Sequence, residues 1–286
     1  MLWLVSAQLV NGIAIGMIYA LMAFGLSIIK GLLNIPNFAH GALYALGAYL
    51  CYSAVSAGLP FPAGLFVAFA GAALAGLLLD RLVVRFVRAG GYLPQLITLF
   101  GAALVIEQLL LIGWGTIGLS YSPPELLRGS IDLGFTLVPR YIAFASLCSA
   151  LVISAVWLLI ERTRFGAWVR AGIERPEMTQ SLGINVDLLL IAGMMLGAGL
   201  AGLAGGLALP LMGATSTMGG DMMAIAFVVL VIGGLGSLYG AIAAGLMVGV
   251  VQSLMTVAAP AASTAIIYLV MIVILLVRPQ GLFGER

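Results

Sequence analysis

The sequence predicts an all-α fold, a polytopic helical membrane protein with one domain over residues 1–286, and three observations support this. Hydrophobic residues make up 63% of the chain and charged residues only 8%, against about 25% charged residues in soluble domains. The mean hydropathy is +1.21, which a water-facing surface does not allow. Thirty-eight glycines in so apolar a chain favour helices that pack closely in lipid.

Nine apolar stretches are candidates for spans, because about 20 apolar residues are needed to cross the hydrocarbon core. The ranges are 4–29, 38–57, 63–87, 93–113, 139–160, 187–209, 222–235, 239–258 and 262–277. The second opens in the polar break Asn34-Ile-Pro-Asn37 and the seventh is short, so eight or ten spans are the alternatives, with one or two broken helices. The first basic residue, Lys30, follows the first range, so that range is expected to be a retained span and no cleaved signal peptide.

The basic residues predict an N-out, C-in orientation. If the connection at 162–186 lies in the cytoplasm, all but two of the twelve lysines and arginines lie inside, the exceptions being Arg128 and Arg140. Basic residues concentrate on the cytoplasmic side of membrane proteins. The other long connection, at about 114–138, is then expected outside, as a polar lid or a short re-entrant piece.

The inner connection, at about 162–186, is expected to be ordered. Pro176 suits the first position of a short helix, Gly183 suits the position that ends it, and Asn185 can cap the next span. Apolar side chains lie among the charges of this connection. Such a surface favours either the lipid headgroups or docking to a cytoplasmic partner.

Pairs of glycines four residues apart predict close helix packing. They are Gly193 with Gly197, Gly202 with Gly206, and Gly236 with Gly240. Small residues at this spacing let two backbones approach in lipid, where association relies on van der Waals contact. The pairs serve packing within the chain or, alternatively, contact with a second subunit or the lining of a narrow path.

Polar side chains at membrane depth are the candidates for function. Glu107 and Gln108 lie in the middle of 93–113, and Asn37 and His40 open the second range. A charge at this depth is costly unless it faces protein, water or a partner. The alternatives are a structural hydrogen bond for Glu107 and a capping or packing role for His40.

The chain offers no chemistry for a nucleotide, a metal or a cofactor. Gly31 follows the only lysine, Lys30, so no phosphate loop of the form G-x-x-x-x-G-K-[ST] exists. One histidine and two cysteines in apolar runs give no metal-ligand spacing. An integral-membrane enzyme is therefore disfavoured. A net charge of +2 disfavours nucleic acid as a partner. Uphill transport by this chain would need an energy source outside the chain.

Motifs spread over nearly the whole chain point to one family. They are Asn37-Phe-Ala-His-Gly41 with the following Ala-Leu-Tyr-Ala-Leu-Gly-Ala-Tyr49, Pro94-Gln-Leu-Ile-Thr98, Thr163-Arg-Phe-Gly-Ala-Trp-Val-Arg-Ala171, Leu182-Gly-Ile-Asn185, Gly199-Leu-Ala-Gly-Leu-Ala-Gly205, Gly233-Gly-Leu-Gly-Ser237 and Arg278-Pro-Gln-Gly-Leu-Phe-Gly284. In this order and spacing they resemble the branched-chain amino acid ABC transporter permeases of the LivH type.

The resemblance implies a multi-pass permease subunit of a bacterial inner-membrane importer. Its cargo would be branched-chain or other hydrophobic amino acids, or alternatively urea, short amides or another small solute. The implied partners are a second permease of the LivM type, two ATP-binding cassette subunits that use the ATP, a periplasmic substrate-binding protein and membrane lipid. A stand-alone secondary carrier is the lower-ranked alternative.

The polar residues at membrane depth and around the broken helix are the candidates for a path, and the resemblance gives a coupling role to the inner connection. Those expected to line or gate the translocation path are Asn34, Asn37, His40, Thr98, Glu107 and Gln108. Those expected to form a coupling loop against the ATPase are Phe165, Trp168, Arg170, Ala171, Glu174, Glu177, Gly183 and Ile184.

Overall fold

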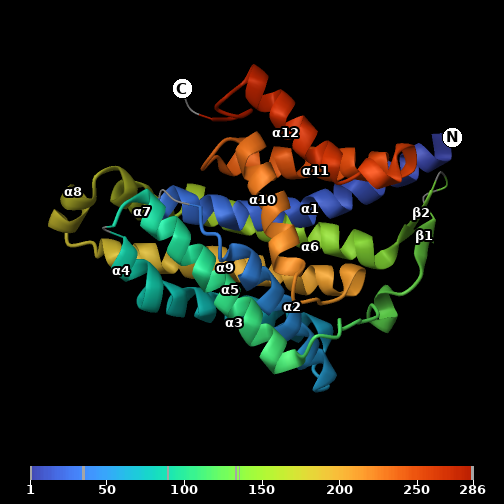
Figure 1. Ribbon diagram of the computed structural model, residues 1–286, viewed down its shortest axis with the longest axis horizontal. Coiled ribbons are helices and arrows are strands. Elements are labelled where there is room, and N and C mark those ends of the chain that lie inside the picture. Colours follow the sequence, from blue (N-terminus) through green and yellow to red (C-terminus); the bar gives the residue numbers. More distant parts are fainter. Residues whose placement is uncertain (1, 34–35, 89, 133, 135, 285–286) are drawn as a thin grey trace.

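The computed structural model describes residues 2–33, 36–88, 90–132, 134 and 136–284, and most of these residues are helical (Figure 1). The α-helices are α1 (Leu2–Leu33), α2 (His40–Ser56), α3 (Phe61–Leu79), α4 (Arg85–Val87), α5 (Tyr92–Trp114), α6 (Arg140–Arg162), α7 (Arg164–Glu174), α8 (Pro176–Ser181), α9 (Val186–Met212), α10 (Met218–Gly233), α11 (Leu238–Ala258) and α12 (Ala265–Val277). The other elements are the π-helix η1 (Asp80–Val84), the 3₁₀ turns η2 (Glu125–Leu127) and η3 (Pro260–Ala262), and the strands β1 (Ser130–Asp132) and β2 (Leu137–Pro139).

Each of the nine apolar ranges expected from the sequence contains a helix. Six helical stretches in the described part of the chain are long and apolar enough to cross a membrane, namely Leu4–Gly31, Phe61–Val87, Tyr92–Trp114, Arg140–Arg162, Val186–Met212 and Leu238–Ala258. Helices α2, α10 and α12 are shorter. The chain is therefore an all-α polytopic membrane protein, whereas nine spans and the N-out, C-in orientation stay predictions.

The outer connection forms more regular structure than the sequence predicts. Strands β1 and β2 pair antiparallel, with Ser130 opposite Pro139. Asp132 Oδ1 accepts a hydrogen bond of 2.8 Å from the Gly134 amide in the turn. A side-chain acceptor at this spacing stabilises a tight turn, so the connection expected to be a polar lid or a short re-entrant piece contains a small hairpin.

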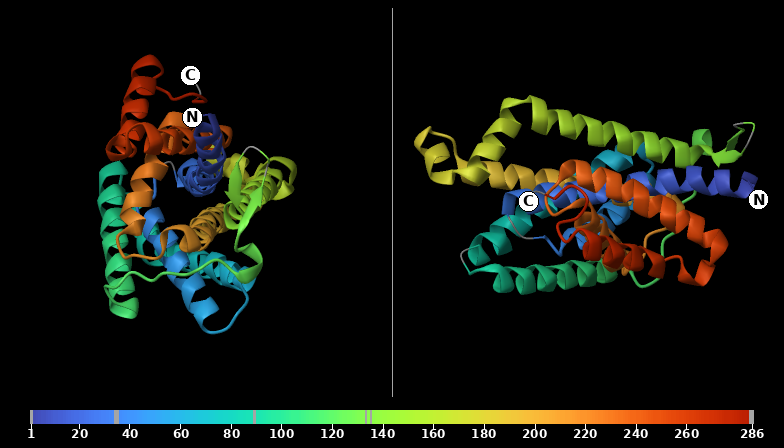
Figure 2. Two further views of the ribbon diagram at one scale, coloured as in Figure 1. Left: turned by 90° about the vertical axis from the view of Figure 1, so that its right-hand side faces the viewer. Right: turned by 90° about the horizontal axis from the view of Figure 1, so that it is seen from above.

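Helices α1, α6 and α9 run along the long axis of the molecule, and α2 and α10 cross that axis at a steep angle (Figures 1 and 2). Helix α9 is buried along most of its length and packs against α1, α2 and α3. Helix α1 packs along α11, where a Cβ on Gly16 would lie 2.9 Å from the Gly245 carbonyl oxygen. Glycines therefore bring the central backbones together.

The predicted glycine pairs on α9 lie in this core. Gly193 is buried on α9. A Cβ on Gly197 would lie 2.7 Å from a carbonyl oxygen of α1, one on Gly202 would lie 2.5 Å from a carbonyl oxygen of α3, and one on Gly206 would lie 3.0 Å from a leucine of α3. These glycines therefore pack against other helices of the same chain.

The third pair is different. Gly240 meets the backbone of Gly233, and the space that a Cβ would need at either residue is already filled. Gly236 instead has a φ of +92° in the turn between α10 and α11, with nothing within 4 Å of a Cβ. The expected packing role of Gly236 is thus replaced by a turn whose backbone conformation favours glycine.

The last described residues fold back onto the end of α10. The Leu282 amide donates to the Ile232 carbonyl oxygen at 2.8 Å, and the Phe283 amide donates to the Gly233 carbonyl oxygen at 3.1 Å. Carbonyls in the last turn of a helix lack partners within the helix. The Arg278–Gly284 motif therefore completes α10 from a distant part of the sequence.

Candidate functional site

The chain between α1 and α2 is interrupted, and its described part, Pro36–Ala39, is not helical. The Asn34 prediction lies outside the described residues. Pro36 lacks an N–H group and disfavours helix in the residue before it. Asn37 Oδ1 accepts from the Ala39 amide at 3.0 Å, and the Asn37 carbonyl oxygen accepts from the His40 amide at 3.0 Å. The turn is thus stabilised by hydrogen bonds to Asn37, and α2 begins directly after it at His40.

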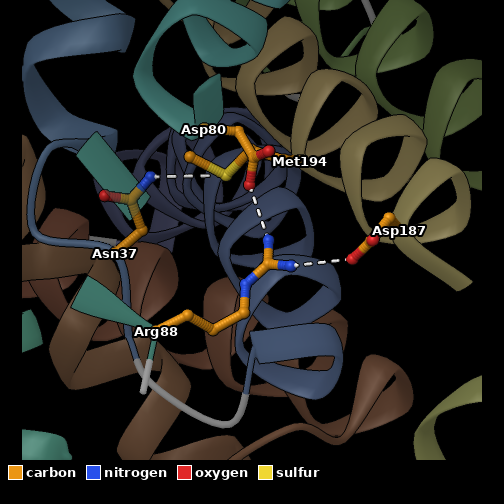
Figure 3. Close-up of polar contacts among 5 residues, drawn as sticks. All are labelled: Asn37, Asp80, Arg88, Asp187 and Met194. Carbon is orange, nitrogen blue, oxygen red and sulfur yellow. Dashed lines mark hydrogen bonds and ion pairs between the residues drawn. The ribbon is translucent and has the colours of Figure 1, made fainter. Parts of the chain in front are cut away.

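Asn37 and His40 are both fully buried. Asn37 Nδ2 donates to Met194 Sδ on α9 at 3.8 Å (Figure 3). His40 Nε2 lies 3.1 Å from the carbonyl oxygen of Met22, in the second half of α1. His40 Nδ1 is buried and has no hydrogen-bond partner among the described residues. Helix α2 therefore begins inside the helix bundle, beside the second half of α1.

Helix α10 begins at the same place. A Cβ on Gly219 would lie 2.7 Å from the Gly41 carbonyl oxygen, and a Cβ on Gly41 would overlap the Gly219 carbonyl oxygen. The rings of Phe38, before α2, and Phe227, further along α10, lie 6.1 Å apart. Two short helices thus meet by their N-terminal turns, which carry the positive ends of the helix dipoles. Short helices that begin inside the bundle form substrate sites in several transporters.

The other path candidates lie on α5. Thr98 Oγ1 donates to the Pro94 carbonyl oxygen of its own helix at 2.7 Å, and Gln108 is exposed. Glu107 is half-buried, and its Oε1 lies 3.9 Å from the place of a Cβ on Gly220, in the first turn of α10. The structure therefore places Glu107 beside α10, and among the described residues no hydrogen bond or ion pair joins it to Asn37 or His40.

Asp221 is a neighbour of Glu107, and the sequence places it at the edge of the seventh apolar range without giving it a role. It lies in the first turn of α10, is exposed, and is close enough to Glu107 for like-charge repulsion. The available signal was an acidic residue directly after Gly219-Gly220 at the start of an apolar helix. Glu107 and Asp221 thus place two carboxylates where α5 lies beside the first turn of α10.

A second polar cluster lies at the C-terminal end of α3, near Asn37 and Met194 (Figure 3). Arg88 Nη2 lies 2.8 Å from Asp80 Oδ1, and Arg88 Nη1 lies 3.5 Å from Asp187 Oδ1. Gln95 Nε2 donates to the Arg88 carbonyl oxygen at 2.8 Å. The Asp80 side chain is only 4% exposed, whereas that of Asp187 is 82% exposed. Arg88 thus joins the end of α3, the start of α5 and the start of α9.

The inner connection is ordered. Pro176 begins α8, Gly183 has a φ of +81° after it, and Asn185 Oδ1 accepts from the Leu188 amide at 3.1 Å at the start of α9. The connection also contains α7, which is longer than α8. Of the eight predicted coupling residues, six are exposed and two, Phe165 and Ile184, are half-buried.

Helix α7 is joined to the end of α6 at a tight corner. Arg170 Nη1 donates to the Ile160 carbonyl oxygen at 2.7 Å and lies 3.7 Å from Glu161 Oε2. A Cβ on Gly166 would overlap the same carbonyl oxygen. Because this carbonyl lies in the last turn of α6, Arg170 satisfies a group that the helix leaves unpaired. The corner fixes the direction of α7 relative to α6.

A cavity of about 440 Å³ lies beside this corner, between α7 and α1. It is lined by α1, α6 and α7, by the turn between α10 and α11, and by the chain end, with Gly31, Arg170, Leu235 and Phe283 among its residues. Ser27 Oγ also borders it, and no hydrogen-bond partner is described for that atom. Helix α7 therefore packs against α6 and α9, and the cavity separates it from the turn between α10 and α11.

Comparison with known families decides the class of the molecule. Residues 8–275 match the family model described as the permease component of branched-chain amino acid transport systems. The chain belongs to this family. The match covers the interrupted start of α2, the short helix α10 and the whole of the inner connection.

Individual relatives agree with this assignment. The BraD permease protein of Pseudomonas aeruginosa, from a high-affinity branched-chain amino acid transport system, is 30% identical over 97% of this permease and 95% of its own length. The LivH permease protein of Escherichia coli K12 is 28% identical over the same shares. The LivM permease protein of that organism is 28% identical over 98% of this permease and 71% of its own length. No solved structure matches significantly.

Proposed function

We propose that this permease is one membrane subunit of a bacterial inner-membrane ABC importer for branched-chain amino acids. The family match over residues 8–275 is the observation that carries the proposal. The partners would be a second permease subunit, two ATP-binding cassette subunits and a periplasmic substrate-binding protein. The similarity to both LivH and LivM supports a pair of related permeases. ATP would be bound by the cassette subunits, with no cofactor held by this chain.

The coupling step would use α7 and α8. Trp168 and Met178 are 45% and 59% exposed among charged neighbours, a composition that suits burial in a protein cleft. A force applied to α7 would reach α6 through Arg170, because that side chain is bonded to the backbone at the end of α6. The cavity beside the corner leaves room for such a movement.

The translocation path would follow the face of α5 and α10 that carries Glu107 and Asp221. A carboxylate facing lipid at membrane depth is costly, so protein or water must cover this face. The second permease subunit is the natural cover, and water between the two subunits would hydrate the carboxylates. An amino acid in such a path presents an ammonium group that a carboxylate can bind. Asn37 and His40, which are buried inside this chain, would hold the start of α2 that borders the path.

The test is leucine uptake into proteoliposomes that contain this permease, the second permease and the ATPase subunits, with the binding protein supplied outside. We expect uptake that requires ATP and the binding protein. Uptake by this chain alone would show a secondary carrier instead. Uptake of a short amide but not of leucine would support the importer and contradict the proposed cargo.

The docking surface is tested with a matched pair of variants. Trp168→Ala should reduce both ATPase association and uptake. Leu126→Ala, which removes an 89% exposed side chain at the opposite end, should leave both unchanged. Equal behaviour of the two variants would contradict the role given to α7.

A further inference from the structure

A basic pocket lies where the span Phe61–Val87 ends, and neither the coupling element nor the path uses it. The pocket has a volume of about 230 Å³ and lies between η1, α4 and the first turns of α9. Arg81, Arg85 and Arg88 line it together with Asp80 and Asp187. Three arginines against two aspartates leave a net positive charge at the rim.

The positive charge is unevenly shared. Arg88 is held between Asp80 and Asp187 (Figure 3), and its buried Nε has no hydrogen-bond partner among the described residues. Arg81 and Arg85 are exposed, and neither forms an ion pair with another described residue. The two side chains lie four residues apart, about one helical turn, and so can approach a single anion. The pocket thus presents unpaired cations beside an arginine fixed in place.

The surroundings of the arginines are strongly apolar. Leu78, Leu82 and Phe86 lie on the adjacent row of the same helical stretch and are 51%, 68% and 75% exposed. Leu188, which lines the pocket from α9, is 62% exposed. A cationic row next to an exposed apolar row, at the end of a membrane span, is the arrangement of a membrane interface.

We propose that this pocket binds the phosphate headgroup of an anionic phospholipid, with the acyl chains lying along Leu78, Leu82 and Phe86. Arg81 and Arg85 would bind the phosphate oxygens, and Arg88 would fix the pocket walls through its two carboxylate partners. An acidic protein segment would match the arginines but would leave the apolar row in contact with water or another lipid. A phospholipid satisfies both rows with one molecule.

The lipid pocket is tested by native mass spectrometry of the full-length permease. The probes are phosphatidylglycerol and phosphatidylcholine with identical acyl chains. We expect the wild type to retain phosphatidylglycerol in preference. The double variant Arg81→Gln/Arg85→Gln should bind it about 30-fold more weakly, because each basic residue near an anionic surface contributes roughly fivefold in affinity. The control Arg128→Gln/Arg140→Gln removes the same charge at the opposite end and should bind as the wild type does.

Several results would overturn the proposal of a lipid pocket. Equal losses in both double variants would show non-specific attraction, and equal retention of the two lipids would show an apolar groove only. Binding of inorganic phosphate as tight as that of phosphatidylglycerol would show a site for free phosphate. Loss of ATPase subunits with unchanged lipid binding would show a protein docking face. If the double variant does not fold, Arg81→Gln and Arg85→Gln alone should each lose about fivefold, and unchanged binding in both would also refute the pocket.

Discussion

Replacement of Gly166 by alanine should disrupt the corner between α6 and α7. A Cβ on Gly166 would lie 2.7 Å from Ile160 Cα and would overlap the Ile160 carbonyl oxygen. Carbon atoms pack at about 3.5–4.0 Å, so the contact with Ile160 Cα alone moves α7 away by about 1 Å, and the closer overlap with the carbonyl oxygen requires a larger movement. The bond of 2.7 Å from Arg170 to the same carbonyl oxygen would then stretch beyond hydrogen-bond range.

The expected loss of stability is the sum of three terms. Overpacking costs about 1–3 kcal/mol, and loss of a hydrogen bond from a charged donor costs about 1.5–3 kcal/mol. Alanine regains about 1 kcal/mol over glycine inside a helix. The free energy of unfolding should therefore fall by about 1.5–5 kcal/mol, and α7 should lose its fixed direction.

Gly172→Ala is the matched control on the same helix. A Cβ there would meet side chains of α9 at 3.5 Å or more, which is ordinary contact. This variant should be as stable as the wild type or slightly more stable. Thermal unfolding in detergent measures the stability, and the ratio of leucine uptake to ATP hydrolysis in proteoliposomes measures coupling. A Gly166→Ala protein with the unfolding temperature and coupling ratio of the wild type would refute the tight corner.

Three further predictions address topology, the arginine cluster and the helix N-termini. In protein without its native cysteines, Ser130→Cys should react with an impermeant reagent from outside and Ser181→Cys should not; the reverse labelling would show the opposite orientation. Asp80→Asn should lower the free energy of unfolding by about 1.5–3 kcal/mol, because Arg88 loses its buried partner, while Asp187→Asn should cost less than about 1 kcal/mol because its carboxylate is exposed; equal unfolding temperatures would argue against the cluster. Gly41→Ala should lower the yield of folded protein in size-exclusion chromatography, because the methyl group would overlap α10, and a wild-type yield would show that the contact is looser.

Features that depend on short stretches of sequence could be predicted well. The apolar ranges, the start of α8 at Pro176 and the turn at Gly183 follow from local chemistry, since proline, glycine and a capping asparagine act within a few residues of themselves. The hydrogen bond from Leu188 to Asn185 is of this kind. The class of fold required nothing more than hydropathy and composition.

Features that depend on distant parts of the chain could not be predicted. Arg88 and Asp187 are 99 residues apart in the sequence, so the basic count recognised Arg88 only as an inside charge. The spacing of Gly236 and Gly240 resembles a packing pair, although only Gly240 packs, because spacing does not reveal which glycine lies in a turn. The sequence singles out Glu107 as a polar residue at membrane depth, but only the packing of α5 shows that it lies beside the first turn of α10.

The docking of the chain end onto α10 has a consequence for biosynthesis. Gly233 leaves the ribosome before Phe283, and at about 5–20 residues per second the intervening chain takes several seconds to synthesise. Through that interval the last carbonyls of α10 lack the partners that residues 282 and 283 later supply. The end of α10 is therefore completed only after α12 has been made, and a chain truncated before Leu282 would leave these two carbonyls without their protein partners.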